Sequence, residues 1–199
     1  MKKLITLMMV FCLLLAGVVQ AESEQAESEM TESEQAESEM TGSDTLVIYF
    51  SCTGTTKGVA EKLANVTGAD LYEIIPAVPY TEEDLNYNDR STRASSEQDH
   101  PDTRPEIGGE DVDLTGYKTV YLGYPIWWGK EPRILCTFVE SHDFTGMTVI
   151  PFCTSGSSGI GGSGSDLEKL AGTGTWLDGE RHSGDISEDE LKDWVEGLQ

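Results

Sequence analysis

Residues 46–57, LVIYFSCTGTTK, contain the strongest signal for the fold of this chain. The first five residues are continuously apolar and rich in β-branched and aromatic side chains. Such a run predicts a strand buried on both faces, as in a parallel sheet. Apolar residues then recur at helical spacing over 56–66, and Gly68 stands where a helix cap is expected. The hydroxyl-rich residues 51–57 therefore connect the end of a buried strand to the start of a helix.

Strands and helices continue to alternate beyond this stretch. Further strands are predicted at 70–75, 119–124, 147–152 and 173–177, the last reaching residue 181 at its longest. Helices are predicted at 132–139, at 165–170 with Ser165 or Asp166 as the cap, and at 191–198 after a capping box that begins at Ser187. The alternation predicts an α/β fold, a three-layer doubly wound sandwich around a five-stranded parallel sheet.

Residues 76–113 interrupt this rhythm with a long polar segment rich in Pro, Asp, Glu and Ser. A connection of that length in a compact domain is usually a lid, a binding loop or a disordered excursion. Thr81-Glu82-Glu83-Asp84 has the form of a capping box and predicts a short helix there. A second short helix is predicted at 91–98. Tyr87 and the Arg90/Arg93 pair remain open as further residues that face a ligand.

The N-terminal residues carry the features of an export signal. Lys2 and Lys3 precede an apolar run over 4–19, and small residues before position 22 predict cleavage after Ala21. The run is short for a membrane span, although an uncleaved anchor remains the alternative. We therefore expect a signal peptide at 1–21, a secreted or extracytoplasmic protein, and no stable membrane insertion after cleavage.

An acidic repeat follows the predicted signal, as AESEQAESEM and then TESEQAESEM over residues 21–40. The repeat has no basic and no aromatic residue, so it cannot bury enough surface to offset the entropy of ordering. Residues 22–43 are accordingly interpreted as a disordered spacer. The folded domain is expected at 44–199.

The net charge of the whole chain is -23. From residue 43 onward, 28 acidic side chains oppose 11 basic ones, which leaves −17 on the expected domain. Such a surface repels nucleic acid and anionic lipid, so neither is expected as a partner. A bound phosphate has to be held by backbone amides and hydroxyl groups rather than by a basic patch.

The cysteines and histidines indicate neither a disulfide framework nor a metal site. After signal cleavage the cysteines are Cys52, Cys136 and Cys153, an odd number without regular spacing. The three histidines, at positions 100, 142 and 182, are scattered and are expected at the surface. Cys52 has no arginine at the spacing that a phosphatase loop needs, so it is interpreted as a packing residue of its loop.

The first loop that carries chemistry is residues 51–57. Gly54 permits a tight turn with positive φ, and hydroxyl groups and free amides converge at a helix N-terminus, where an anion is favoured. No GxxxxGK[ST] pattern is present, which disfavours ATP and GTP. An ordinary Ser/Thr-rich helix cap is the alternative. Ser51, Thr53, Gly54, Thr55 and Thr56 match in order the loop that holds the FMN phosphate in flavodoxins, so the loop resembles that family's, and the resemblance implies non-covalently bound FMN.

The second loop follows the strand at 119–124 and reads GYPIWWG, residues 123–129. It resembles the flavin-facing loop of bacterial flavodoxin-like proteins. The resemblance implies that Pro125, Ile126, Trp127, Trp128 and Gly129 line the cofactor, with Trp127 or Trp128 against its ring. In the alternative, one tryptophan belongs to the core and the other covers a helix.

The third loop, residues 154–164, is rich in Gly and Ser, which let the backbone approach a ligand closely. It resembles the third flavin loop of the same family, which implies that Thr154, Ser155, Gly156 and Gly159 contact the cofactor. A flexible linker is the alternative. Residues 159–164 satisfy GxGxxG, but they begin too far from the strand end for a dinucleotide site.

Three functions remain open, and no constellation of a catalytic acid, base or nucleophile favours one of them. The resemblance to flavodoxins implies an FMN-binding electron-transfer protein that meets an unidentified redox protein or small electron acceptor. One alternative is an FMN-dependent NAD(P)H reductase of quinones or similar acceptors. The other is a flavin-binding module without turnover.

Overall fold

The computed structural model describes residues 42–198. The predicted signal peptide and all of the predicted spacer except its last two residues lie outside this range, so both stay predictions. Among the described helices, none is long and apolar enough to cross a membrane.

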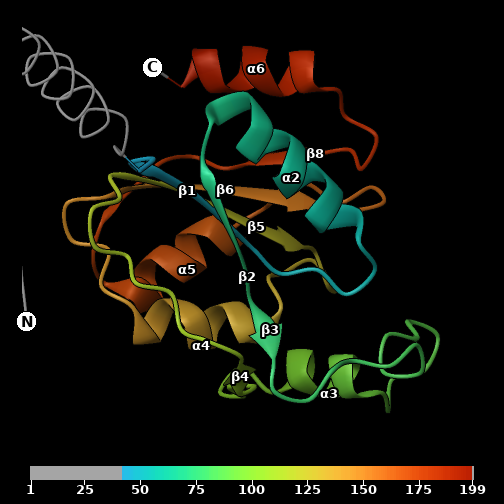
Figure 1. Cartoon of the computed structure of the whole chain (residues 1–199). Coiled ribbons are helices and arrows are strands. Elements are labelled where there is room, and N and C mark those ends of the chain that lie inside the picture. The colour runs from blue at the N-terminus through green and yellow to red at the C-terminus, as the bar shows by residue number, and fades with distance from the viewer. Residues whose placement is uncertain (1–41, 199) are drawn as a thin grey trace, which may run out of the picture. The chain divides into compact units, whose positions relative to one another are not determined.

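The described domain is built around one parallel sheet (Figure 1). Its strand order is β2-β1-β5-β6-β7, and a short strand β8 also pairs in parallel with β6. The bounds are Thr45–Tyr49 for β1, Asp70–Glu73 for β2, Thr119–Pro125 for β5, Thr148–Thr154 for β6, Thr175–Trp176 for β7 and Glu180–His182 for β8. The predicted α/β class with five strand positions is confirmed, and the fifth position is shared by β7 and β8.

Helices cover both faces of the sheet. Helices α2 (Thr55–Thr67) and α6 (Glu188–Gly197) lie on one face, and α4 (Arg133–Ser141) and α5 (Ser163–Ala171) lie on the other (Figure 1). Side chains of β1 alternate between the two cores, with Leu46, Ile48 and Phe50 on the α4 side and Val47 and Tyr49 on the α2 side. This alternation between two buried faces explains why residues 46–50 are apolar at every position.

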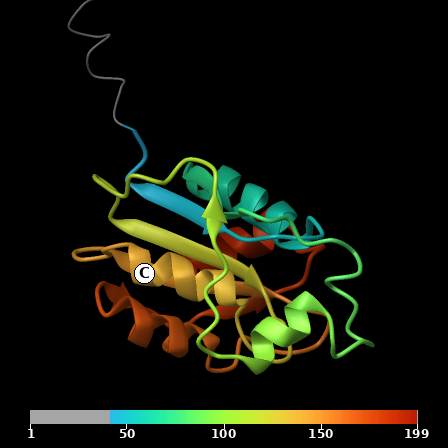
Figure 2. The same ribbon diagram turned by 90° about the horizontal axis from the view of Figure 1, so that it is seen from below.

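The segment 76–113 is ordered and lies on the α4 side of the sheet (Figure 2). The strand predicted over 70–75 ends at Glu73, and β3 (Ile75–Pro76) instead pairs antiparallel with β4 (Ile107–Gly108). Helix α3 (Arg93–Asp99) fulfils the prediction for 91–98, with Thr92 as its N-cap. Of the three possibilities left open for this segment, a disordered excursion does not describe it.

The capping predictions have three different outcomes. Ser187 and Glu190 form the predicted capping box of α6. Thr81 and Asp84 exchange the bonds of such a box, but only turns follow, so the helix predicted there is wrong. Helix α5 begins at Ser163 without a side-chain cap, so the predicted cap at Ser165 or Asp166 is wrong as well.

The prediction that all three histidines lie at the surface is wrong for His182. Its side chain is only 3% exposed, because β8 carries it under α6, where its ring lies 4.5 Å from that of Trp194. His100 is exposed as expected, whereas the side chain of His142 is 8% exposed.

Candidate cofactor site

The first loop leaves the N-terminus of α2 open. Gly54 is the N-cap of α2 and has a φ of 84°, as the sequence predicted, and no side chain caps this helix. Ser51 folds the loop back, since its Oγ accepts a hydrogen bond of 3.1 Å from the Gly54 N–H. The amides of the first helical turn therefore remain available to an anion, which the helix dipole favours. The alternative of an ordinary hydroxyl-capped helix does not describe this loop.

The third loop is fastened to the first by a buried contact. The Oγ1 atoms of Thr56 and Thr154 lie 2.8 Å apart, and both side chains are buried. Thr154 is the last residue of β6, so the contact ties the first turn of α2 to the carboxyl end of a central strand. The two loops therefore keep a fixed spacing.

A cavity of about 420 Å³ opens at these carboxyl ends. Its lining comes from all three loops and from the segment 76–113: Ser51, Cys52, Thr53, Thr55, Thr56, Leu85, Tyr87, Pro125, Ile126, Trp127, Thr154, Ser155 and Gly156. The lining therefore combines hydroxyl groups from the first and third loops with apolar and aromatic side chains from the second loop and from the segment 76–113. Of the predicted site residues, Gly54, Trp128, Gly129 and Gly159 do not line the cavity, although Gly54 shapes the loop that does.

The two adjacent tryptophans have different positions. Trp127 is 3% exposed and makes edge contacts with Phe50 and Tyr80, at ring-centroid distances of 5.7 and 5.2 Å. It is a core residue and also lines the cavity. Trp128 lies beside the cavity, with its ring 4.7 Å from that of Tyr87. Trp127 therefore satisfies both the prediction that a tryptophan lines the cavity and the alternative that one belongs to the core, whereas Trp128 does not line the cavity.

The second loop is a tight turn. Trp127 and Lys130 exchange backbone hydrogen bonds of 2.9 and 3.0 Å. Between them Trp128 has a φ of 47° and Gly129 a φ of 82°, as a two-residue type I′ turn requires. Glycine adopts this conformation freely, but a tryptophan there is strained by roughly 1–3 kcal/mol. The surrounding structure must hold Trp128 in place.

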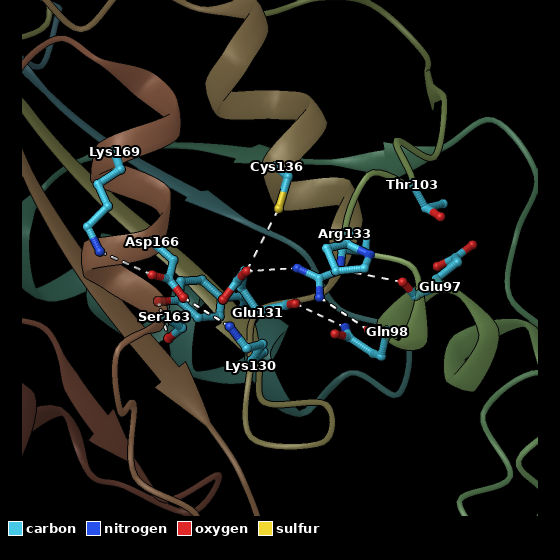
Figure 3. A network of polar contacts seen from close by, with 12 residues as sticks. Glu97, Gln98, Thr103, Lys130, Glu131, Arg133, Cys136, Ser163, Asp166 and Lys169 are labelled. Carbon is cyan, nitrogen blue, oxygen red and sulfur yellow. Dashed lines mark hydrogen bonds and ion pairs between the residues drawn. The ribbon is translucent and has the colours of Figure 1, made fainter.

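A polar network behind this turn supplies that support (Figure 3). Lys130 pairs with Asp166 of α5 at 3.1 Å. Glu131 pairs with Arg133 at 3.2 Å, and both side chains are almost wholly buried. Arg133 also donates to the carbonyl oxygens of Glu97 and Gln98 at the end of α3, where a cation is favoured. The pair therefore joins the turn to the segment 76–113.

The network affects the protonation of Glu131. Burial raises the pKa of its carboxyl group, although the positive charges of Arg133 and Lys130 oppose the shift. Sequence reasoning missed both Glu131 and Arg133, and the signal was a pair of opposite charges on either side of Pro132 directly after the turn.

Of the three residues in the segment 76–113 that the sequence left open as ligand-facing, only the tyrosine lines the cavity. Tyr87 lines the cavity. Arg93 turns instead to Glu97, at 2.7 Å, and its guanidinium carbon lies 3.9 Å from the centroid of the Tyr80 ring. Arg90 pairs with Asp99 at the surface. Neither arginine lines the cavity.

Cys52 lies in the cavity wall and packs against the core. Burial raises the pKa of its thiol to about 12, so the thiol stays protonated at neutral pH. A protonated thiol is a poor nucleophile. This agrees with its interpretation as a packing residue.

Fold and site together define a class. A doubly wound sheet that places an uncapped helix N-terminus and aromatic side chains around one cavity at its carboxyl ends is a domain of flavodoxin-like fold. The sequence model of the flavodoxin family matches residues 44–198. The chain belongs to the flavodoxin family.

Solved structures resemble this one over the whole domain. A protein of Bacteroides eggerthii described as a flavoprotein is 43% identical with a TM-score of 0.73, over 77% of this chain and 96% of its own. For one of Bacteroides uniformis the values are 41%, 0.74, 78% and 99%. A Lactobacillus acidophilus flavoprotein solved in complex with FMN shares the fold at 22% identity and a TM-score of 0.57, over 76% and 97% of the two chains. Among curated proteins, no match was found.

Proposed function

We propose that this chain is an FMN-binding electron-transfer protein that acts outside the cytoplasmic membrane. The observation that carries the proposal is the composition of the cavity, where one space of about 420 Å³ is lined both by the hydroxyl-rich loop at an uncapped helix N-terminus and by apolar and aromatic side chains. A phosphate ester on a flat ring system has the same two kinds of surface. The complex of the Lactobacillus protein with FMN supports this choice of ligand.

The residues of the first loop fit a phosphate. Thr53, Thr55 and Thr56 line the cavity beside the uncapped amides of α2, so donors are present without a basic patch. Lys57 pairs with Glu73 at 3.6 Å, and its charge is thereby partly neutralised. Hydroxyl and amide donors at a helix N-terminus are sufficient to bind a phosphate.

The apolar part of the lining fits a flat ring. Pro125, Ile126 and Trp127 come from the second loop, and Leu85 and Tyr87 add surface from the segment 76–113. When bound there, FMN supplies the redox chemistry, while the protein supplies orientation and electrostatics. These side chains would bind the ring and exclude water from it.

A carrier fits the cavity better than a reductase does. The volume lies near the small end of the range of roughly 300–1,000 Å³ for ligand pockets, which suits one mononucleotide. A reductase needs space for NAD(P)H as well. The lining contains no His, Asp, Glu, Lys or Arg, and burial keeps its thiol protonated. A binding module without turnover has the same cavity and is separated from a carrier only by experiment.

The cofactor and the activity have separate tests. Purified protein with its flavin removed should bind one FMN in calorimetry and recover a flavin absorbance spectrum, and a protein that refuses FMN contradicts the proposal. With FMN bound, aerobic NADH oxidation no faster than that of free FMN supports the carrier, whereas rapid turnover identifies the reductase. Reversible reduction and reoxidation by an artificial one-electron mediator separates a carrier from an inert module.

The place of action has its own test. The proposal of extracytoplasmic action rests on residues 1–21 and on the acidic composition that follows them. Full-length chain produced in a bacterial host should appear outside the cytoplasm with a new N-terminus at Glu22. Retention of the intact chain in the cytoplasm contradicts it.

A further inference from the structure

One arginine of the described chain differs from the others in its partners. Four arginines each form an ion pair with a carboxylate within 4.0 Å: Arg90, Arg93, Arg104 and Arg133. Among residues 42–198, Arg181 has no such partner, although the domain carries 28 acidic side chains. Its guanidinium therefore forms no ion pair in the described domain, although Glu180, Asp185 and Glu190 line a second cavity together with it.

Arg181 contacts the backbone of a residue that lines the cofactor cavity. Strand β8 places it opposite Cys153 in the parallel pairing with β6. Its Nη2 donates a hydrogen bond of 2.8 Å to the carbonyl oxygen of Ser155, which lines the cavity. The side chain is half-buried, and its Nε is buried without a partner in the described structure. A guanidinium with an unused donor thus sits under the third loop.

The geometry points to Arg181 as a positioning residue of the FMN site, which holds the third loop through the Ser155 carbonyl and provides a cation without an ion-pair partner that favours the reduced, more negative cofactor over the oxidised one. This inference rests on the proposed binding of FMN. The inference goes beyond the proposed function because it assigns a role in setting the redox potential to Arg181, a residue outside the cavity lining.

Charge is the physical reason for that effect. A domain at −17 resists the addition of electrons to a bound cofactor, and a nearby unpaired cation offsets this resistance. A half-buried charge is screened by salt less than an exposed one is. The field of Arg181 already reaches the end of β6, because the guanidinium opposes the rise in the pKa of Cys153 that burial causes.

Two variants separate the charge of Arg181 from its hydrogen bond. Arg181→Gln removes the charge, and Arg181→Lys retains it. Arg104→Gln is the matched control, since it removes the same unit of charge from a site where Arg104 pairs with Glu140 and does not line the cavity. For each protein, calorimetry under anaerobic conditions gives the Kd of oxidised FMN and that of dithionite-reduced FMN.

We expect Arg181→Gln to raise the ratio of reduced to oxidised Kd about tenfold, which lowers the two-electron midpoint potential by about 30 mV. The ratio should change less than threefold in Arg181→Lys and less than twofold in Arg104→Gln. An unchanged ratio in folded Arg181→Gln overturns the inference and leaves FMN binding intact, whereas a wild-type chain that does not bind FMN overturns the proposed function itself.

If Arg181→Gln does not fold, Arg181→Lys still tests whether the charge of Arg181 affects the ratio of the two Kd values. A wild-type ratio in Arg181→Lys, together with a weaker Kd for both forms of FMN, supports a cation that acts through charge and a bond that orders the loop. A tenfold rise in the ratio for Arg181→Lys shows that charge is not the cause, and so overturns the inference.

Discussion

The hydroxyl oxygens of Thr56 and Thr154 lie 2.8 Å apart in the protein interior, although 98 residues separate them in the sequence. Thr56 belongs to the first turn of α2 and Thr154 ends β6. Because both residues also line the cavity, one hydrogen bond sets the distance between its two polar walls.

Replacement of one threonine should cost more than replacement of both. Thr56→Val leaves the buried Thr154 hydroxyl without its partner, which lowers the free energy of unfolding by about 1–3 kcal/mol. Thr56→Val with Thr154→Val removes both polar groups and should recover part of that loss. Urea denaturation of the two single variants and the double variant measures the coupling. Strictly additive losses contradict a direct bond.

The positive φ of Gly54 matters for ligand binding as well as for stability. Gly54→Ala and Gly68→Ala place a side chain in a left-handed conformation at opposite ends of α2, with φ values of 84° and 66°. Each should cost about 1–2 kcal/mol of stability. Only Gly54→Ala should weaken FMN binding, by roughly tenfold, because only Gly54 shapes the loop beside the cavity. Equal loss of affinity in both variants would mean that the loop has no special role.

The two tryptophans should respond differently to substitution. Trp127→Ala leaves a void against Phe50 and Tyr80 and should cost about 3–5 kcal/mol. Trp128→Gly relieves the positive φ while it removes contact with Tyr87, so the net change in stability should stay within about 1 kcal/mol. Thermal or urea unfolding of both variants measures the difference. Similar losses in both contradict the assignment of Trp127 to the core.

Acid should destabilise the fold through His182. Burial lowers the pKa of this imidazole below its ordinary value, so the unfolded chain binds the proton more tightly. Stability is therefore full above the unfolded pKa of about 6.5 and falls as the pH drops through the range between the unfolded and folded values. His182→Phe should flatten the fall in urea midpoint between pH 7.5 and pH 5.5. His100→Phe, at an exposed position, should leave the slope unchanged, and the same slope in both variants would rule out His182 as its source.

Local pattern was sufficient for much of this molecule. The apolar, β-branched and aromatic run 46–50 favours a strand covered on both faces, and Gly54 with its surrounding hydroxyls is compatible with an open helix N-terminus. Each of these features depends on residues within a few positions of one another. For that reason the sheet, most helix positions and the anion loop were predictable from the sequence.

The remaining features depend on contacts between segments that are distant in the sequence. Tyr87 joins the cavity because α3 is held by Arg133, and Trp127 rather than Trp128 lines it because Phe50 and Tyr80 enclose that indole. His182 is buried because α6 folds back over β8. The direction that a side chain takes from a loop depends on partners far away in the sequence, so no local pattern of residues specifies it.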